Sequence, residues 1–444
     1  MNARALSSIL SALLALSACG PGPSTCVPGA QVACACPGGT SGIQRCNAEG
    51  ALDECVCGEP IVDASIPDAS EPDASIVDAS TVDAPAQDGG TEPPPCTDEL
   101  DLMFMVDNSN SMAEEQASLT VELPRLVRAL ASGDRELDGI QDFTPISSLH
   151  VGVISSDMGS GGHAVPTCGG GTFGAMFGDD GVLLGRGRTE LAGCAATYPP
   201  VFEYRSGDDT ADFAADVACV VTTGTGGCGL EQQLEAVLKS ISPSYATIWT
   251  APGYVPPTFF SGTSGHAVAA NAGFVREGSI LAALVVTDEE DCSAVDTDLF
   301  NPASATYTAD LNLRCFTYPD ALQPIERFVT GLGALRRDPR RLVLSVIAGV
   351  PVDLSGDTDA EYAAILADSR MQEQVDSTVP NRLVPSCNVP GRGLAFPPRR
   401  IVSVARGLDA LGAQTDVESI CRDDFGPAID ALVISIADAV ATCR

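Results

Sequence analysis

The sequence predicts an α/β fold over residues 96–444, built on a doubly wound, mostly parallel sheet with long insertions. Two observations predict it. Short, nearly continuous apolar runs are typical of strands buried on both faces of a sheet, and amphipathic helical patterns lie between these runs. Strands that alternate with helices form parallel sheets, whose ligands bind beyond the carboxyl ends of the strands.

The elements follow in order along the chain. The predicted strands are the apolar runs at 100–106, 149–155, 280–286 and 342–348. The predicted helices place apolar residues three and four positions apart, at 119–130, 230–241, 322–335 and 429–440. The Gly- and Pro-rich stretches at 158–200, 242–278 and 350–398 are predicted insertions, which we expect disulfides to staple.

The first 18 residues predict an export signal. Arg4 is their only charge, and the apolar stretch from Leu6 to Leu16 is too short to span a bilayer. The stretch ends in "LSAC", which resembles the lipobox of bacterial lipoproteins, where the signal is cut before a Cys that is then acylated. The resemblance implies a lipid on Cys19, a tether over 19–25 and an exported protein anchored in the bacterial cell envelope. It leaves open whether the outer-membrane anchor faces the periplasm or the surface.

The cysteine count supports export. The chain has 17 Cys, which is high for a cytosolic protein and normal for an exported one. With Cys19 set aside as the lipid site, six lie before residue 58 and ten lie after residue 95. Because both groups are even, each can close its own disulfides. We therefore expect no free thiol in the lipidated protein, and we expect Cys96 to pair with Cys443.

Two small segments precede the large domain. Residues 26–57 are Gly-rich and Cys-dense, too few to bury a useful core, so disulfides must hold them. Zinc is the alternative, but the paired Cys are one residue apart, closer than structural zinc sites use. Residues 58–95 repeat Asp every five positions from Asp63 to Asp83, which predicts a disordered, extended linker.

The formal net charge of −35 excludes one class of partner. Nucleic-acid binding requires basic surface that displaces counterions from phosphates, so we expect no nucleic-acid partner. An acidic protein of this kind is soluble and attracts divalent cations.

Polar side chains follow two predicted strands at the point where each strand ends. In "LMFMVDNSNSM" an apolar run stops at Asp107, and Ser109 and Ser111 follow at alternate positions; Asp288 follows a later strand in "LVVTDEEDCS". Carboxyl ends of parallel strands meet at one edge of a sheet, and carboxylate and hydroxyl oxygens suit Mg²⁺ or a similar small cation. The alternative, a helix N-cap, explains only one of these residues.

These motifs resemble the von Willebrand factor A domain, a Rossmann-like fold whose D-x-S-x-S loop is a metal-ion-dependent adhesion site. The resemblance covers roughly residues 96–444. The metal ligands it implies are Asp107, Ser109, Ser111 and Asp288. It also implies a threonine from the loop before a central helix, which we assign to Thr225 in "VVTTGTGGCG", with Thr222 and Thr223 left open.

Two departures from the family pattern bear on the metal. Asn110 stands where Gly is common, and Glu289 replaces the Gly usual after the strand-end Asp. Mg²⁺ is the expected cofactor, with Ca²⁺ and Mn²⁺ as alternatives, and Glu289 adds charge that favours Ca²⁺.

The expected function is metal-dependent binding of a protein, for adhesion or protein–protein interaction. By the resemblance, this unknown ligand presents an Asp or Glu carboxylate to the metal. A structural scaffold stabilised by metal is the first alternative, and a secreted hydrolase is the second. We expect no enzyme: "GTGGCG" lacks the acid that a dinucleotide site needs about 20 residues on, and the three His have no assignable catalytic partner.

Overall fold

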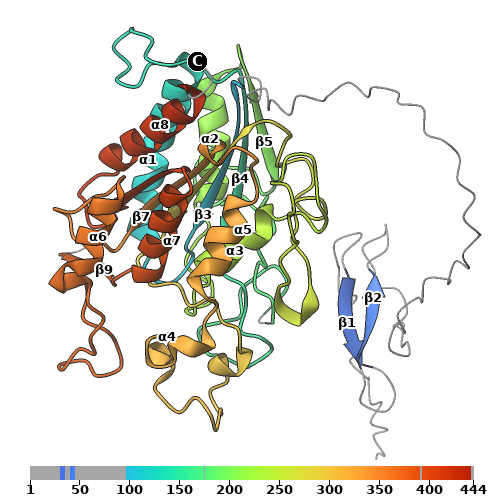
Figure 1. Ribbon diagram of the computed structural model, residues 1–444, viewed down its shortest axis with the longest axis vertical. Helices are drawn as coiled ribbons and strands as arrows, with labels where there is room; N and C mark the ends of the chain where they lie inside the picture. The colour runs from blue at the N-terminus through green and yellow to red at the C-terminus, as the bar shows by residue number, and fades with distance from the viewer. Residues whose placement is uncertain (1–30, 36–40, 46–96, 175, 391–392, 442–444) are drawn as a thin grey trace, which may run out of the picture. The chain divides into compact units, whose positions relative to one another are not determined.

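The computed structural model describes residues 31–35, 41–45, 97–174, 176–390 and 393–441 (Figure 1). The chain divides into two compact units, Met1–Val77 and Asp78–Arg444. In the first unit, β1 (Gln31–Ala35) pairs antiparallel with β2 (Ser41–Arg45). The signal, the lipid site Cys19, the tether, the linker 58–95 and the expected Cys96–Cys443 pair lie outside the described residues, as do the Cys side chains of 26–57.

The second unit contains a six-stranded sheet in the order β10-β7-β6-β3-β4-β5. Every neighbouring pair is parallel except β4 and β5. The strands are β3 (Glu99–Val106), β4 (Ser148–Ser155), β5 (Val201–Arg205), β6 (Ile280–Val286), β7 (Leu342–Ala348) and β10 (Gln414–Ser419). The α/β fold with a mostly parallel sheet is thus confirmed, and the four predicted strands match to within one residue at each end.

Helices cover both faces of this sheet (Figure 1). On one face lie α1 (Ala113–Ser132), α2 (Thr210–Val221) and α8 (Gly426–Ala441). On the other lie α3 (Gln233–Ile241), α5 (Ile325–Gly333), α6 (Asp359–Ala367) and α7 (Arg399–Ala410). A short helix, α4 (Arg314–Thr317), lies in the connection between β6 and α5. The described helices include none long and apolar enough to cross a membrane.

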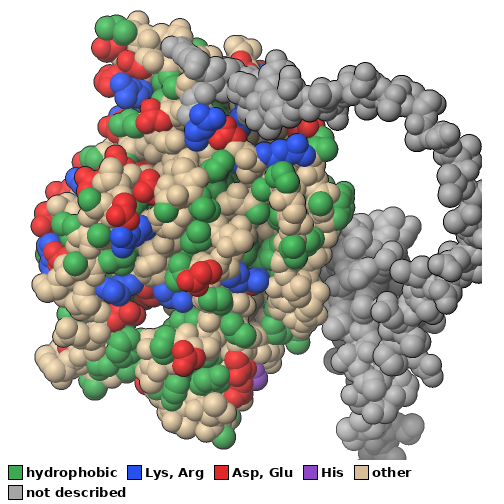
Figure 2. Space-filling model, viewed as in Figure 1, with side chains coloured by type: hydrophobic (Ala, Val, Ile, Leu, Met, Phe, Trp, Pro, Cys, Tyr) green, Lys and Arg blue, Asp and Glu red, His purple; other side chains and the backbone are tan. Residues whose placement is uncertain are grey.

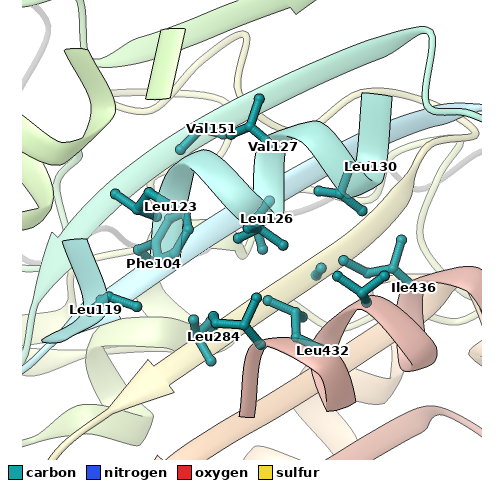
Figure 3. Packing of buried hydrophobic residues seen from close by; sticks show 14 of the residues in the cluster. Phe104, Leu119, Leu123, Leu126, Val127, Leu130, Val151, Leu284, Leu432 and Ile436 are labelled. Carbon is teal, nitrogen blue, oxygen red and sulfur yellow. The ribbon is translucent and has the colours of Figure 1, made fainter. Parts of the chain in front are cut away.

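The apolar residues of the central strands divide between the two faces. Phe104 of β3 belongs to the same core as Leu126 of α1 and Leu432 of α8 (Figure 3). Met103 and Met105 belong to the core on the opposite face. This alternation follows from the pleat, which turns successive side chains to opposite faces. Strands buried on both faces therefore read as unbroken apolar runs.

Among the described residues, three disulfides staple the predicted insertions at 158–200 and 350–398, and a fourth lies in the connection between β6 and α5. The described pairs are Cys168–Cys228, Cys194–Cys219, Cys292–Cys315 and Cys387–Cys421. The last joins the end of β10 to a small hairpin of β8 (Cys387–Val389) and β9 (Gly393–Ala395).

The expectation of stapling is wrong for the insertion at 242–278, which contains no Cys. Buried side chains hold it instead. The amide of Asn271 bonds the backbone of Leu183, Gly181 and Ser240, and the Lys239 ammonium bonds Thr263 and Asp180. Hydrogen bonds to backbone and side-chain groups fix this loop where a covalent bond fixes the others.

A buried charge cluster lies at the amino end of β3. The Asp101 carboxylate accepts from Arg276 Nε at 2.6 Å and from the hydroxyl of Ser279 at 2.5 Å. The guanidinium of Arg336, itself buried, lies 3.7 Å from the same carboxylate. Each charge in this cluster has an opposite charge beside it.

The surface is mixed in character: the face shown in Figure 2 carries acidic, basic and apolar side chains interspersed.

Candidate functional site

Asp107 and Asp288 leave the sheet at the same edge. Strands β3 and β6 are parallel neighbours with Val106 opposite Val286, and the Asp107 N–H donates to the Val286 carbonyl at 2.9 Å. The residues just after the two strands therefore lie side by side at the carboxyl edge of the sheet. A direct bond follows from this register: the Thr287 hydroxyl donates to Asp107 Oδ2 at 2.6 Å.

The Asp107 carboxylate is fully buried. Its Oδ1 accepts from the Ser109 N–H at 2.8 Å and from the Ser156 hydroxyl at 3.3 Å, beside the Thr287 bond to Oδ2. Burial raises the pKa of Asp107, and these hydrogen bonds lower it in part. Every hydrogen-bond donor here is a neutral group, so none of them removes the charge of the carboxylate.

Asp288 is 4% exposed, and its Oδ1 has no hydrogen-bond partner among the described residues. Burial, followed by the charge of Asp107, raises the pKa of Asp288 to about 8. The Ser111 hydroxyl acts against this rise, which places it beside Asp288. Because the hydroxyls of Ser109 and Ser111 are 3.3 Å apart, the structure gathers these four predicted residues.

Further carboxyl groups surround this pair. Burial raises the pKa of Glu231 and of Glu289 well above the usual range, and the charges of Asp107 and Asp288 raise both further. The charges that act most on Asp288, Glu231 and Glu289 all come from carboxylates. Sequence reasoning missed Glu231, although it stands just after the Gly-rich loop that precedes α3.

The run "DEEDCS" divides its acids between the site and the fold. The Glu290 carboxylate accepts from the Arg400 N–H at 2.9 Å, in the first turn of α7. Asp291 accepts from the Leu234 N–H at 3.0 Å, in the first turn of α3. Carboxylates satisfy free N–H groups at helix starts, so these two acids are structural. Asp288 and Glu289 remain for the site.

The three candidate threonines have different surroundings. The Thr222 hydroxyl donates to the Ala218 carbonyl at 3.0 Å, where α2 ends. Thr223 is buried, and its hydroxyl accepts from Gln116 Nε2 at 3.0 Å. Thr225 is half-buried. The same Gln116 nitrogen donates to the Asp107 carbonyl at 2.9 Å, so Thr223 is held close to the backbone of Asp107.

A second group of acids lies apart from the strand ends. The carboxylate oxygens of Asp134, Glu136 and Asp142 lie within 4.8 Å of one another, close enough to hold a metal ion. Sequence reasoning missed this group. Its signal is the alternation of Asp134, Glu136 and Asp138 before Gly139, as at the start of an EF-hand loop, although Pro145 stands where that loop has its Glu.

A comparison of the chain with protein families found no match, and neither did a comparison with curated proteins. The geometry of the site is therefore what bears on function.

Proposed function

We propose that residues 96–444 form a von Willebrand factor A-type domain that binds a protein ligand through a divalent cation. Asp107, Asp288, Ser109 and Ser111 would hold the cation, with a threonine of the loop at 222–225. One observation carries the proposal: Asp288, almost fully buried beside the buried Asp107, has a carboxylate oxygen without a hydrogen-bond partner among the described residues.

Charge balance supports a cation at this position. Burying a carboxylate without an opposite charge is costly, and here several carboxyl groups share one buried region with only neutral donors to Asp107. Carboxylate and hydroxyl oxygens suit a hard cation such as Mg²⁺. Ca²⁺ and Mn²⁺ are the alternatives, and the nearby Glu231 and Glu289 favour Ca²⁺, which accepts more oxygen ligands.

The ligand we propose is an Asp or Glu side chain of a partner protein. Hydroxyl ligands carry no charge, so a cation held partly by Ser109 and Ser111 keeps positive charge toward the outside. Ser111 is exposed, which leaves that side of the site open. A partner carboxylate that replaces a water on the cation forms a strong contact in a partly dry environment.

Capture of an envelope protein tests this proposal. The full-length protein should retain a partner in Mg²⁺ and release it in chelator. Asp107→Ala should abolish capture, whereas Ser109→Ala should weaken it less because only a neutral donor is lost. Asp216→Ala, which removes an exposed carboxylate on α2, is the matched control and should capture normally.

Three results would count against adhesion. Undiminished capture by Asp107→Ala in chelator, with circular dichroism showing an intact fold, would overturn the metal-dependent mechanism. A cation that raises the melting temperature while no partner is captured would favour the scaffold. Turnover of a substrate would favour the hydrolase.

We further propose that a lipid on Cys19 anchors the protein in the cell envelope, on the basis of the "LSAC" motif. The measurement is fractionation of cells that express Cys19→Ser. The variant should leave the membrane fraction, and retention there at the level of the unchanged protein would contradict lipid anchoring.

A further inference from the structure

A single buried amide connects three segments at the edge of the candidate site. Gln116 lies in the first turns of α1 and is 1% exposed. The two protons of its Nε2 are shared among three acceptors, the Asp107 carbonyl at 2.9 Å, the Thr223 hydroxyl at 3.0 Å and the Gly224 carbonyl at 2.9 Å. Its Oε1 accepts from the Gly224 N–H at 3.0 Å. The start of α1, the end of β3 and the loop at 222–225 thus share one side chain.

The backbone conformation of Gly224 constrains this loop as well. Gly224 has a φ of +87°, a conformation that side chains other than glycine rarely adopt. A Cβ at this position would lie 2.7 Å or less from the Arg188 guanidinium atoms. The loop therefore passes between Arg188 and Gln116. The two hydrogen bonds between the Gln116 amide and the Gly224 backbone fix the position of the loop relative to α1.

These bonds also orient the Thr223 hydroxyl. Because the hydroxyl oxygen accepts from Gln116, one of its lone pairs is occupied and the other is available. The Thr223 hydroxyl oxygen and the Asp107 carbonyl oxygen lie close together, because both accept from the same Gln116 nitrogen. The Thr223 hydroxyl is thus an oriented neutral oxygen beside the Asp107 backbone, and a hydroxyl oxygen is a donor that a hard cation accepts.

We propose that Gln116 is a positioning residue that presents Thr223, rather than Thr222 or Thr225, to the cation. This inference rests on the proposed function, because it requires that Asp107 and Asp288 bind a divalent cation. Gln116 does not touch the cation in this arrangement. It acts through Thr223, in the way that residues outside the coordination shell orient the ligands of other metal sites.

Calorimetric titration of the full-length protein with Mg²⁺ alone, repeated with Ca²⁺, tests the inference. Asp288→Asn identifies which part of the signal belongs to this site and which to any other acidic group. Gln116→Met, which keeps the length of the side chain and removes the amide, should lower the affinity for the cation about tenfold. Thr223→Val should lower it by a similar factor.

A double-mutant cycle separates positioning from a general loss of structure. If Gln116 acts through Thr223, the double variant should bind no more than about twofold more weakly than the weaker single variant, because residues that act together are not additive. Gln372→Met is the matched control: it removes an amide that donates to the Leu366 and Asp368 carbonyls, both at 3.0 Å, and should leave affinity unchanged.

Gln116→Leu provides a second test if Gln116→Met does not fold. It removes the donors to Thr223 and Asp107 without adding a charge beside the cation, so affinity should still fall. Additive losses in the cycle, or a loss with Thr225→Val and none with Thr223→Val, would overturn the role of Gln116 while cation binding stands. An unchanged protein that binds neither cation at this site would overturn the proposed function and this inference together.

Discussion

The two ends of β3 hold buried carboxylates in opposite electrostatic surroundings. Asp101, at the amino end, lies against Arg276 and Arg336, so the protein supplies the opposite charge itself. Asp107, at the carboxyl end, accepts only from neutral donors, and its charged neighbours are other carboxylates. One end of β3 thus carries a carboxylate paired with guanidinium groups, and the other end carries a cluster of carboxyl groups without a positive charge beside Asp107 among the described residues. The comparison teaches that a buried acid is a candidate for cation binding where the fold provides no counter-ion, and not where it provides one.

The largest effect is expected where the charges are complete. Asp101→Asn leaves the buried guanidinium of Arg336 and the half-buried guanidinium of Arg276 without their carboxylate, and loss of one member of a buried ion cluster costs about 3–5 kcal/mol. Denaturant unfolding in chelator should show this loss. Under the same conditions Asp107→Asn should be as stable as the unchanged protein or more stable, because burial disfavours the Asp107 charge. Equal destabilisation by both variants would remove the contrast between the two ends.

Removal of the cation should have the next largest effect. A ligand at a hundred times its dissociation constant stabilises the folded state by about 2.7 kcal/mol. The melting temperature of the unchanged protein should therefore rise with added Mg²⁺ or Ca²⁺ and fall in chelator. Asp107→Asn combined with Asp288→Asn should remove the part of this response that belongs to the site. The Asp101 cluster predicts no response of its own, so a full response in the double variant would contradict the proposal.

A third buried acid sharpens the comparison, because a proton takes the place of the cation. Asp416 on β10 accepts from the hydroxyls of Ser345 and Ser435, and burial raises its pKa from 3.8 to about 7. Between these values the folded state holds a proton that the unfolded state has lost, so stability falls as pH rises. The slope from this group is about 1.4 kcal/mol per pH unit, and it ends above the folded pKa.

Unfolding of Asp416→Asn from pH 4 to pH 7 measures this contribution, since that interval spans the two pKa values of the group. The amide keeps its shape and does not ionise, so the stability of the variant relative to the unchanged protein should increase with pH. A difference that stays constant across the interval would show that Asp416 is ionised in the folded state throughout.

The smallest effect concerns a neutral donor at the carboxyl end. The Ser156 hydroxyl donates to Asp107 Oδ1 at 3.3 Å, the longest of the bonds to this carboxylate. Its removal in Ser156→Ala should lower cation affinity by only about twofold, because long hydrogen bonds are weak. Thr287→Val, which removes a bond of 2.6 Å, should have the greater effect in the same titration. The reverse order would show that bond length does not rank the donors here.

The sequence predicted the centre of the sheet better than its edges. Strands such as β3 and β6 are buried on both faces, so burial leaves an unbroken apolar run. The edge strand β10 reads "QTDVES", and its polar residues are compensated by tertiary bonds such as that of Ser345 to Asp416, which no local pattern reveals. Helix α7, "RRIVSVARGLDA", is amphipathic and was detectable from its spacing, but it adjoins a Gly/Pro-rich stretch that obscured its start.

The candidate site divides in the same way. Asp107 and Asp288 each follow a strand. Because the carboxyl ends of parallel strands lie at one edge of a sheet, the sequence alone predicted that these two residues lie close together. Glu231 and Thr223 lie in a loop whose path depends on Gly224 and on contacts with Gln116, more than a hundred residues earlier in the chain. Spacing along the sequence does not encode such a path. The structure was needed to place them.

Three of the disulfides have a consequence for the rate of the binding that we propose. Cys228 lies in the loop of Thr223 and Glu231, Cys292 follows Asp291, and the hairpin of Cys387 precedes Phe396, whose N–H donates to the Asp288 carbonyl at 2.8 Å. Three segments at the carboxyl edge are thus tied by covalent bonds. In the binding that we propose, these segments would lose little conformational freedom on association, which favours a rate set by encounter and a residence time set by the contacts formed.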